Sequence, residues 1–413
     1  MTFAKRKFKW LLREPLTYGA NEVGEATNPD WPRYIRITDL NDNGTLRDDT
    51  YKTLASELAA PYLLEDGDLL FARSGATSGK AFLYRSKHGA ACFAGYLIRA
   101  KIDLRHAFPQ FLYYFSQSDL YWRQISEATI QATIQNVSAE KYASLEVPLP
   151  PLATQRRIAA YLDRETSEID RLIAAKERLL TLLGEKRRAL ITHAVTHGTN
   201  TSVKSVYSGV EWIGEIPQGW RIVRGKQILV ERDERSEDGQ EELLTVSHIT
   251  GVTARTEKDV TMFEAVSKEG YKICRTGDLA VNTMWAFMGA LGVAKIDGIV
   301  SPSYNVYVPS ADVDPDYLDM LVRIPNFCEE IRRNSKGVWS SRLRLYAESL
   351  FDLRFPLPPV IEQRQIVKKV EGDLRIANLL ESACRRSLTL IHERRSALIA
   401  AAVTGQISIE DDE

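Results

Sequence analysis

The chain has 413 residues, of which 44% are hydrophobic and 26% are charged, so a fibrous or largely disordered protein is excluded and two cores of about 150 residues each are expected. Lys and Arg number 54 and Asp and Glu 55, so any nucleic-acid surface has to be a local patch. No apolar run approaches the roughly 20 residues that cross a bilayer, and we expect a cytoplasmic protein without a membrane partner. The cysteines form no C-x-x-C pair and indicate buried thiols in a reducing compartment: Cys92, Cys274, Cys328 and Cys384.

Residues 1–147 have the pattern of a mixed α/β domain. Short β-type runs lie at 34–37 and 91–94, and a helix is expected at about 108–124. Asn43-Gly44 and Asp66-Gly67 are turn signals between such runs. These features predict a first domain with short strands joined by tight turns.

Residues 148–198 change character after a Pro-rich start. Apolar residues recur there in steps of three and four, which predicts one helix from about 152 to 196, a rod of roughly 65 Å. The expected seam, typical of a coiled coil, consists of Leu162, Ile169, Leu172, Leu179, Leu183 and Leu190.

Residues 199–355 match the first domain in pieces. The segment 246–249 aligns with 37–40, and Gly-Asp-Leu at 277–279 aligns with 67–69, each followed by a short strand-like run. The two domains then diverge, with FARSGATSGK at 71–80 and VNTMWAFMG at 281–289. We expect two domains of the same fold that carry different recognition surfaces.

Residues 356–413 repeat the helical region. The sequence PLPPLATQRRI at 148–158 recurs as PLPPVIEQRQI at 356–366, an ungapped offset of 208 residues that continues to the ends of both helices. A repeat of this length is a domain with its connecting element, because solenoid units run to only about 20–50 residues. The second helix has a corresponding stripe of Ile366, Val370, Ala377, Leu380, Cys384, Leu388, Ile391 and Leu398. The predicted fold is α+β: an internal duplication of two mixed α/β domains, each followed by a long helix, with the helices paired as an antiparallel coiled coil.

No catalytic, cofactor or metal constellation stands out. The string GATSGK at 75–80 has three residues between its glycines and Ala81 after its lysine, so it does not fit a nucleotide-hydrolysing phosphate loop. His193 and His197 are spaced to share a metal on a helix, but their repeat counterparts are Ala401 and Gly405, which favours a solvated helix end. We expect a non-catalytic chain with neither cofactor nor metal.

Several motifs together resemble one known family, the specificity subunits of type I restriction-modification enzymes, across almost the whole chain. They are the PLPP start of each helix with a glutamine four residues after its last proline, the Arg-Arg pairs at 187–188 and 394–395, an Ala-Val-Thr triplet closing each helix, EWIGEIPQGW at 211–220 and GIVSPSY at 298–304. The first domain departs from the pattern, because it opens on FKWLL at 8–12 in place of a Trp-Ile-Gly-Glu-Ile-Pro segment.

The resemblance implies two target-recognition domains, 1–147 and 199–355, and two conserved helical spacers, 148–198 and 356–413. Each domain would read one half of a split, asymmetric site in double-stranded DNA. The paired helices would set the gap and bind two methyltransferase subunits through their apolar and Arg-rich outer faces. Motor and endonuclease subunits would join the complex for cleavage.

Base readout requires Arg or Lys for guanine and Asn or Gln for adenine, which selects polar residues in the divergent segments. In the first domain we select Arg73, Ser74, Thr77, Lys80, Gln131, Gln135 and Asn136. In the second we select Asn282, Thr283, Trp285, Ser340, Ser341, Arg342 and Arg344. The alternative for each residue is a surface position that contacts phosphate or nothing, and for 73–80 a solvated hairpin tip.

Two other classes of function remain open at this point. A non-enzymatic scaffold with twin globular heads on a coiled coil would purify alone and show no sequence-dependent DNA binding. An enzyme in its own right would show catalysis by the isolated chain with a metal or methyl donor.

Overall fold

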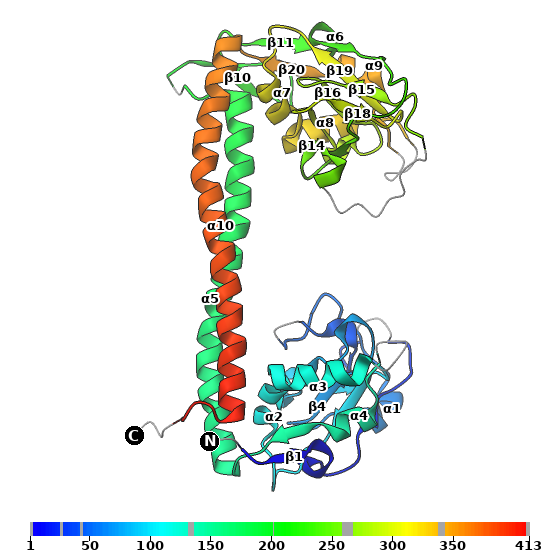
Figure 1. Cartoon of the computed structure of the whole chain (residues 1–413), viewed down its shortest axis with the longest axis vertical. Coiled ribbons are helices and arrows are strands. Elements are labelled where there is room, and N and C mark those ends of the chain that lie inside the picture. Colours follow the sequence, from blue (N-terminus) through cyan, green and yellow to red (C-terminus); the bar gives the residue numbers. More distant parts are fainter. Residues whose placement is uncertain are drawn as a thin grey trace. The chain divides into compact units, whose positions relative to one another are not determined.

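The structure, a computed structural model, describes residues 3–24, 28–41, 44–130, 136–200, 202–257, 267–337 and 343–409 (Figure 1). The chain divides into two compact units: unit 1 consists of Met1–Glu177 and Arg385–Glu413, and unit 2 of Arg178–Cys384. Both divisions fall within the two long helices, α5 (Leu152–His197) and α10 (Val360–Thr404). Among the described residues, no helix combines the length and the apolar character that crossing a membrane requires.

Unit 1 contains eight described strands and four short α-helices besides its parts of α5 and α10. The strands are β1 (Lys5–Lys7), β2 (Thr17–Tyr18), β3 (Arg33–Ile35), β4 (Leu69–Ala72), β5 (Ala81–Leu83), β6 (Ala91–Phe93), β7 (Leu97–Ala100) and β8 (Glu146–Pro148). The α-helices are α1 (Ser56–Ala59), α2 (Pro109–Phe115), α3 (Asp119–Ile130) and α4 (Ala139–Ser144). Single 3-10 turns occupy η1 (Phe8–Leu11), η2 (Ile37–Asp39), η3 (Ala60–Tyr62), η4 (Gly75–Thr77) and η5 (Ser86–His88).

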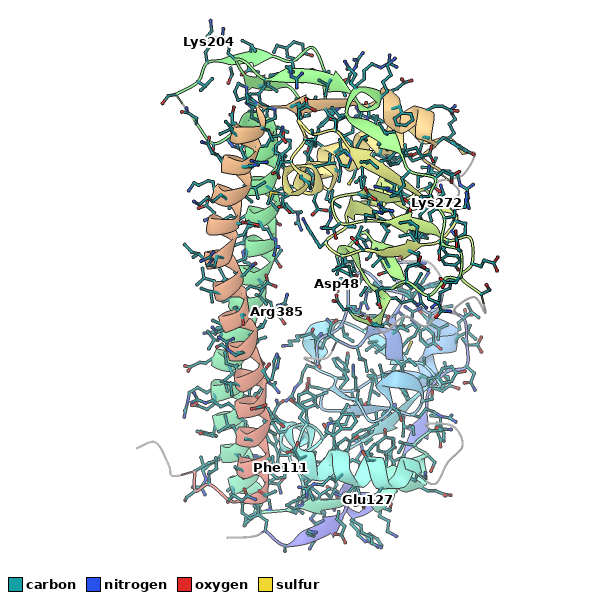
Figure 2. All side chains as sticks on the ribbon, turned by 45° about the horizontal axis from the view of Figure 1, so that its top comes forward. Asp48, Phe111, Glu127, Lys204, Lys272 and Arg385 are labelled. Carbon is teal, nitrogen blue, oxygen red and sulfur yellow. The ribbon has the colours of Figure 1, made fainter. Side chains whose placement is uncertain are left out.

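The main sheet of unit 1 has the strand order β2-β7-β4-β5 and is buried on both faces. Successive side chains of a strand point to opposite faces, so Leu69 and Phe71 of β4 join the core under the helices, while Leu70 and Ala72 join a second core on the other face. Phe111 of α2, labelled in Figure 2, belongs to the helical core. Burial on both faces explains why β4 is a continuous apolar run without alternation.

Unit 2 contains twelve described strands and four short α-helices besides its parts of α5 and α10. The strands are β9 (Ser205–Tyr207), β10 (Glu215–Pro217), β11 (Arg221–Arg224), β12 (Leu229–Glu231), β13 (Leu244–Ser247), β14 (Gly251–Ala254), β15 (Lys272–Cys274), β16 (Leu279–Asn282), β17 (Leu291–Val293), β18 (Gly298–Val300), β19 (Tyr304–Pro309) and β20 (Arg354–Leu357). The helices are α6 (Gly225–Ile228), α7 (Pro315–Val322), α8 (Pro325–Asn334) and α9 (Ala347–Asp352), with 3-10 turns η6 (Arg255–Glu257) and η7 (Ala286–Met288).

The main sheet of unit 2 has the order β12-β19-β16-β17 and the same antiparallel pairing as the sheet of unit 1. Its central strand again divides its side chains between two cores, with Leu279 and Val281 on one face and Ala280 on the other. The strand-like runs expected after Gly67 and Gly277 are therefore confirmed as β4 and β16.

The expected helix at 108–124 is divided into α2 and α3. The hydroxyl groups of Ser116 and Ser118 donate to the carbonyls of Tyr113 and Phe115, at 2.6 and 2.7 Å. Local hydrogen bonds of this kind compete with the helical ladder and end α2 after two turns.

Each long helix begins directly after a proline pair, because the residue before a proline is disfavoured in the α conformation. The repeated glutamine fixes this start. Gln155 donates to the carbonyls of Pro150 (2.9 Å) and His106 (3.1 Å) and accepts from the amide of Phe108 (2.8 Å). Gln363 makes the same three contacts with Pro358 (2.8 Å), Asp312 (2.9 Å) and Asp314 (2.7 Å).

Within each unit, one part of α5 packs against one part of α10 in antiparallel fashion. In unit 1, Ile158 and Leu162 share a core with Ile399 and Val403. The Arg395 guanidinium there pairs with Asp170, with a shortest N–O distance of 2.8 Å. In unit 2, Val195 near the end of α5 shares a core with Ile366 and Val370 near the start of α10.

The expected apolar seam is wrong at Leu172, Leu179 and Leu380, which are 47%, 46% and 54% exposed. Ile173 is buried in place of Leu172. Leu162 and Ile173 are eleven residues apart, a spacing of three turns of an ordinary α-helix, whereas the expected seam followed seven-residue repeats. The displaced leucines lie on the outer surface of the helices.

Candidate nucleic-acid interface

The segment 73–80 connects β4 to β5 and is held by a backbone frame. The amide of Ala72 donates to the carbonyl of Lys80 at 2.8 Å, and the amide of Val137 donates to the carbonyl of Arg73 at 2.8 Å. Gly79 has φ +92°, and a Cβ there would lie 2.7 Å from the Trp122 ring, so this turn requires glycine. The frame brings the segment after residue 135 beside the loop.

Arg73 is half-buried and its guanidinium lies over the ring of Tyr18, 4.9 Å from the centroid. The hydroxyl of Tyr18 accepts from the amide of Ala139 at 3.2 Å, which fixes the ring. The Arg73 Nε is buried without a hydrogen-bond partner in the structure. A cation held on an aromatic face with an unsatisfied donor is suited to bind an acceptor-rich ligand.

Ser74 and Asn136 form a β-bridge, so two residues selected from separate segments lie side by side. The Asn136 Oδ1 is a second buried polar atom without a partner in the structure. Thr77 and Lys80 are half-buried on the same loop. Arg73, Ser74, Thr77, Lys80 and Asn136 thus form one polar cluster, whereas Gln131 and Gln135 lie outside the described residues.

The segment 283–290 connects β16 to β17 and has the same frame. The amide of Asn282 donates to the carbonyl of Ala290 at 3.0 Å, and the amide of Leu345 donates to the carbonyl of Thr283 at 2.9 Å. Gly289, like Gly79, has φ +92°. The hydrogen bonds inside the loop and the side chains that it carries differ from those of 73–80.

The residues selected in unit 2 divide into buried and exposed groups. Asn282 and Thr283 are only 7% and 6% exposed, and the Thr283 hydroxyl donates to the carbonyl of Ser303 at 3.1 Å. As placed, these two support the loop and do not project from it. Trp285 is 49% exposed, and Arg344 is exposed and paired backbone to backbone with Lys336. Ser340, Ser341 and Arg342 lie outside the described residues.

Sequence reasoning missed Tyr18, Met284, Met288 and Lys336. Tyr18 meets Arg73 only because β2 pairs with β7 beside β4, which no local pattern reveals. Lys336 lies beside the selected Arg344 through a backbone pairing. Met284 and Met288 flank Trp285, and apolar residues at a turn were a usable signal.

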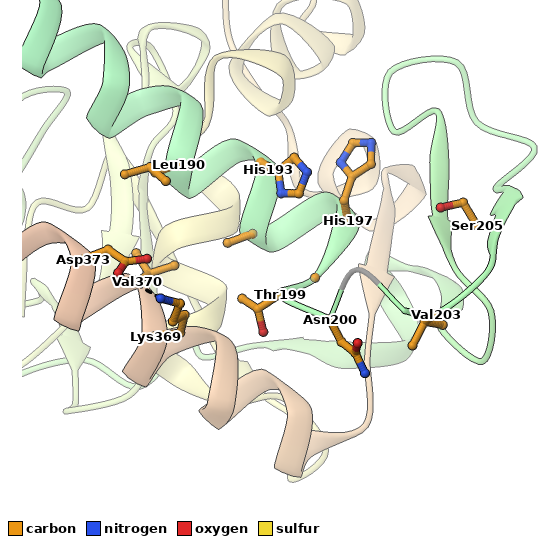
Figure 3. A pocket seen from close by; sticks show the side chains of 12 residues that line it. Leu190, His193, His197, Thr199, Asn200, Val203, Ser205, Lys369, Val370 and Asp373 are labelled. Atoms are coloured by element: carbon orange, nitrogen blue, oxygen red, sulfur yellow. Dashed lines mark hydrogen bonds and ion pairs between the residues drawn. The ribbon is translucent and has the colours of Figure 1, made fainter.

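The ends of α5 and α10 in unit 2 enclose a cavity of about 350 Å³ with His193 and His197 on one side and Lys369 and Asp373 on the other (Figure 3). The two imidazole rings are stacked with centroids 4.9 Å apart. Burial, and then the neighbouring His193, lowers the pKa of His197. Lys369 pairs with Asp373 at 3.0 Å, and within the described ranges no group of three or more His, Cys, Asp or Glu residues is placed to hold a metal ion.

The outer faces of the long helices carry exposed apolar side chains. In unit 2 they are Leu179, Leu182, Ile361, Ile376, Leu379 and Leu380. In unit 1 they are Leu172 and Leu390. Exposed apolar side chains such as Ile376, Leu379 and Leu380, which lie within one turn and a half of α10, are candidates for contact with a protein partner.

The model of the family described as "Type I restriction modification DNA specificity domain" matches residues 19–181. The type I restriction enzyme StySPI specificity subunit of Salmonella potsdam is 24% identical over 311 residues, which are 73% of this chain and 66% of that subunit. The chain therefore spans just under two thirds of the length of that curated relative.

Two solved structures are similar in fold. One, described under "Structural basis underlying complex assembly and conformational transition of the type I R-M system", has a TM-score of 0.71 at 16% identity and covers 98% of both chains. The HsdS subunit from Thermoanaerobacter tengcongensis has a TM-score of 0.52 at 16% identity and covers 98% of this chain and 97% of that one. The chain is thus similar in sequence to the type I restriction-modification DNA specificity domain and to a curated type I specificity subunit, and similar in fold to these two solved structures.

Proposed function

We propose that this chain is the sequence-reading subunit of a type I restriction-modification complex. It reads a bipartite, asymmetric site in double-stranded DNA, with the domain at 1–147 on one half-site and the domain at 199–355 on the other. The helical regions at 148–198 and 356–413 pair as an antiparallel coiled coil that sets the gap. The two domain–helix halves are an internal duplication.

One observation carries this proposal: the two units present loops with the same backbone frame and different side chains. Gly79 and Gly289 have the same φ, and two backbone bonds at the ends of the loops correspond: Ala72 to Lys80 with Asn282 to Ala290, and Val137 to Arg73 with Leu345 to Thr283. Yet 73–80 presents an arginine and hydroxyl groups, and 283–290 presents a tryptophan and methionines. Two half-sites of different sequence require different side chains, and these can be carried on loops with the same backbone.

The polar cluster of unit 1 fits the base edges of a duplex. A guanidinium donates to two acceptors of guanine, and the amide of an asparagine is complementary to adenine. The unpartnered Nε of Arg73 and Oδ1 of Asn136 offer a donor and an acceptor of this kind. DNA would satisfy both buried groups, which otherwise cost stability.

The exposed apolar face of the helices supports a docking role for two methyltransferase subunits. Leu182, Ile376 and Leu379 in unit 2 are about half exposed or more. A duplicated helical region would serve the same partner twice. Motor and endonuclease subunits would join this assembly for cleavage, and the chain itself would have no catalytic role and no cofactor.

The test is to map adenine methylation in a host that expresses this chain with the methyltransferase encoded beside it. We expect a split motif with two defined halves and a fixed gap, absent from a host that lacks the chain. The methyltransferase should copurify with the chain, and the purified complex should bind that motif.

Two results would contradict different parts of the proposed function. An assembled complex without methylation and without sequence-dependent DNA binding would contradict the proposal and favour a scaffold with twin heads. Methyl transfer or cleavage by the isolated chain would contradict the non-catalytic role.

A further inference from the structure

The loop 283–290 of unit 2 ends in an exposed apolar tip. Met284, Trp285 and Met288 are 45%, 49% and 45% exposed. The residues between them are anchored, since Ala286 is fully buried and Phe287 packs against the core of the unit. Three large apolar side chains held outside a core on one turn are costly in water and indicate a surface that they contact.

The tip is rigid. The amide of Trp285 donates to the carbonyl of Asn282, that of Met288 to the carbonyl of Trp285, and that of Ala290 to the carbonyl of Trp285, at 3.0, 3.0 and 3.1 Å. Thr283 is fixed on both sides by Ser303 and Leu345. Because these hydrogen bonds fix its backbone, the tip keeps its conformation when it contacts a ligand.

Two exposed cations lie next to the tip. Leu345 bonds to the carbonyl of Thr283, and the preceding Arg344 pairs with Lys336 through two backbone bonds of 3.0 Å. Neither side chain has a carboxylate partner in the part of the chain that the structure describes. An apolar tip flanked by free cations is complementary to a base stack between two phosphate backbones.

The corresponding loop of unit 1 has a different character. Arg73 and Asn136 there supply hydrogen-bonding atoms, and Ser74 stands where unit 2 has Met284. The apolar tip is therefore not a requirement of the shared backbone frame. It belongs to the half-site that unit 2 reads.

We propose that Met284, Trp285 and Met288 form a wedge that enters one base step of the half-site read by unit 2 and unstacks it. Arg344 and Lys336 hold the flanking phosphates. Base steps that unstack at a low energy cost bind the wedge best, so the wedge selects a flexible pyrimidine–purine step. This inference rests on the proposed function and assigns to the second half-site a mode of readout that the first does not use.

The experiment uses the complex of the chain with its methyltransferase subunits and a duplex carrying the mapped motif. A donor and an acceptor dye at the duplex ends report bending, because wedges kink DNA by about 20–90°. We expect the wild-type complex to raise energy transfer, Trp285→Ala to lose most of that rise, and Trp285→Phe to retain much of it. Tyr207→Ala, which removes an exposed aromatic residue of β9 in the same unit, is the matched control and should bend DNA like the wild type.

Salt dependence separates the wedge from a charge contact. Loss of one stacked aromatic weakens binding by about 5- to 150-fold. Trp285→Ala should do so with an unchanged slope of log affinity against log salt. Arg344→Ala should reduce that slope by about 1.

Two results would overturn the wedge while leaving the proposed function intact: specific binding by the wild type without bending, or equal bending by the wild type and Trp285→Ala. If the wild-type complex binds no motif, the proposed function fails and the wedge fails with it. Equal melting temperatures of the wild type and Trp285→Ala will show that a lost bend does not come from misfolding.

Discussion

Arg73 owes its position to residues far from it in the sequence. Tyr18 supplies the ring under the guanidinium, Ala139 fixes that ring, and Val137 binds the arginine's carbonyl. The side chain is thereby ordered before any ligand arrives, which lowers the entropy lost on binding. Its stacking face and its planar fork are both features that lysine lacks.

Replacement of Arg73 by alanine should relax the motif at one base position. The expected discrimination loss is about 1–3 kcal/mol at that position if the guanidinium reads a base. Arg73→Lys should relax the same position, because it keeps the charge and loses the planar fork. Competition binding with single-base variants of the mapped motif measures both.

Arg105→Ala removes an exposed arginine of the same unit and should leave the motif unchanged. A uniform loss of affinity for all DNA sequences in Arg73→Ala would show that Arg73 contacts phosphate. That outcome contradicts base readout by this residue.

The polar residues of 73–80 and 136 were selected from the sequence because Arg, Lys, Asn and Gln side chains can read bases, and whether they do so stays a prediction. Asn282 and Thr283 were selected as well, yet both are buried. Their burial depends on Leu345 and Ser303, which bond to Thr283 from other segments. Local composition cannot reveal contacts of this kind.

Among the elements, the starts of the long helices show how a repeated motif acts. Gln155 and Gln363 are fully buried and satisfy three backbone groups each, two carbonyls and one amide. The amide belongs to Phe108 or Asp314, the residue that precedes α2 or α7. Each glutamine thus joins a long helix to the helix that covers the sheet.

Gln155→Ala should destabilise this junction by about 1–3 kcal/mol, because it leaves buried backbone groups unsatisfied. Faster hydrogen exchange of the segment around Phe108 measures the effect. Gln124→Ala is the matched control: Gln124 bonds to both backbone groups of Glu146, but water can replace it at a half-buried site. Equal protection in Gln155→Ala and the wild type would refute the role.

The long helices themselves were predicted closely, within one residue of the observed bounds of α5, since their prolines and periodic apolar residues are local signals. The seam was predicted less well. An apolar stripe with 3.5 residues per turn and one with 3.67 residues per turn bury different leucines after a few turns. Which of the two forms depends on the packing of the partner helix. Leu172 and Leu179 are exposed for this reason.

At the scale of the whole molecule, the helical repeats and the short shared anchors predict an internal duplication, which stays a proposal, whereas the strand order of the two sheets could not be read from the sequence. The domains share only short anchors in sequence, such as Gly-Asp-Leu. Their strand orders, β2-β7-β4-β5 and β12-β19-β16-β17, nevertheless correspond. Cores tolerate many apolar combinations, so topology outlasts sequence similarity.

Four residues inserted after Gly184 of α5, with four after Glu381 of α10, should lengthen the gap in the motif by about one to two base pairs. One helical turn adds about 6 Å, and a base-pair step rises about 3.4 Å. Both half-sites should remain the same. Methylation mapping reads the outcome directly.

The same four residues inserted at Gly209, in the turn between β9 and β10, should leave the gap unchanged. An unchanged gap after the paired helical insertion, in a complex that still methylates, would contradict the role of the helices as a spacer. A changed half-site would contradict it as well.

Because the backbones of 73–80 and 283–290 are held in a similar way, either loop could in principle replace the other between its two strands. The segments have equal length, two corresponding backbone bonds hold their ends, and each contains a glycine with φ +92° next to its last residue. Exchange of one loop for the other within a single gene would therefore keep both of these bonds at the ends of the segment. Under the proposed function, such an exchange would change one half-site of the methylated motif in one step and leave the long helices unchanged.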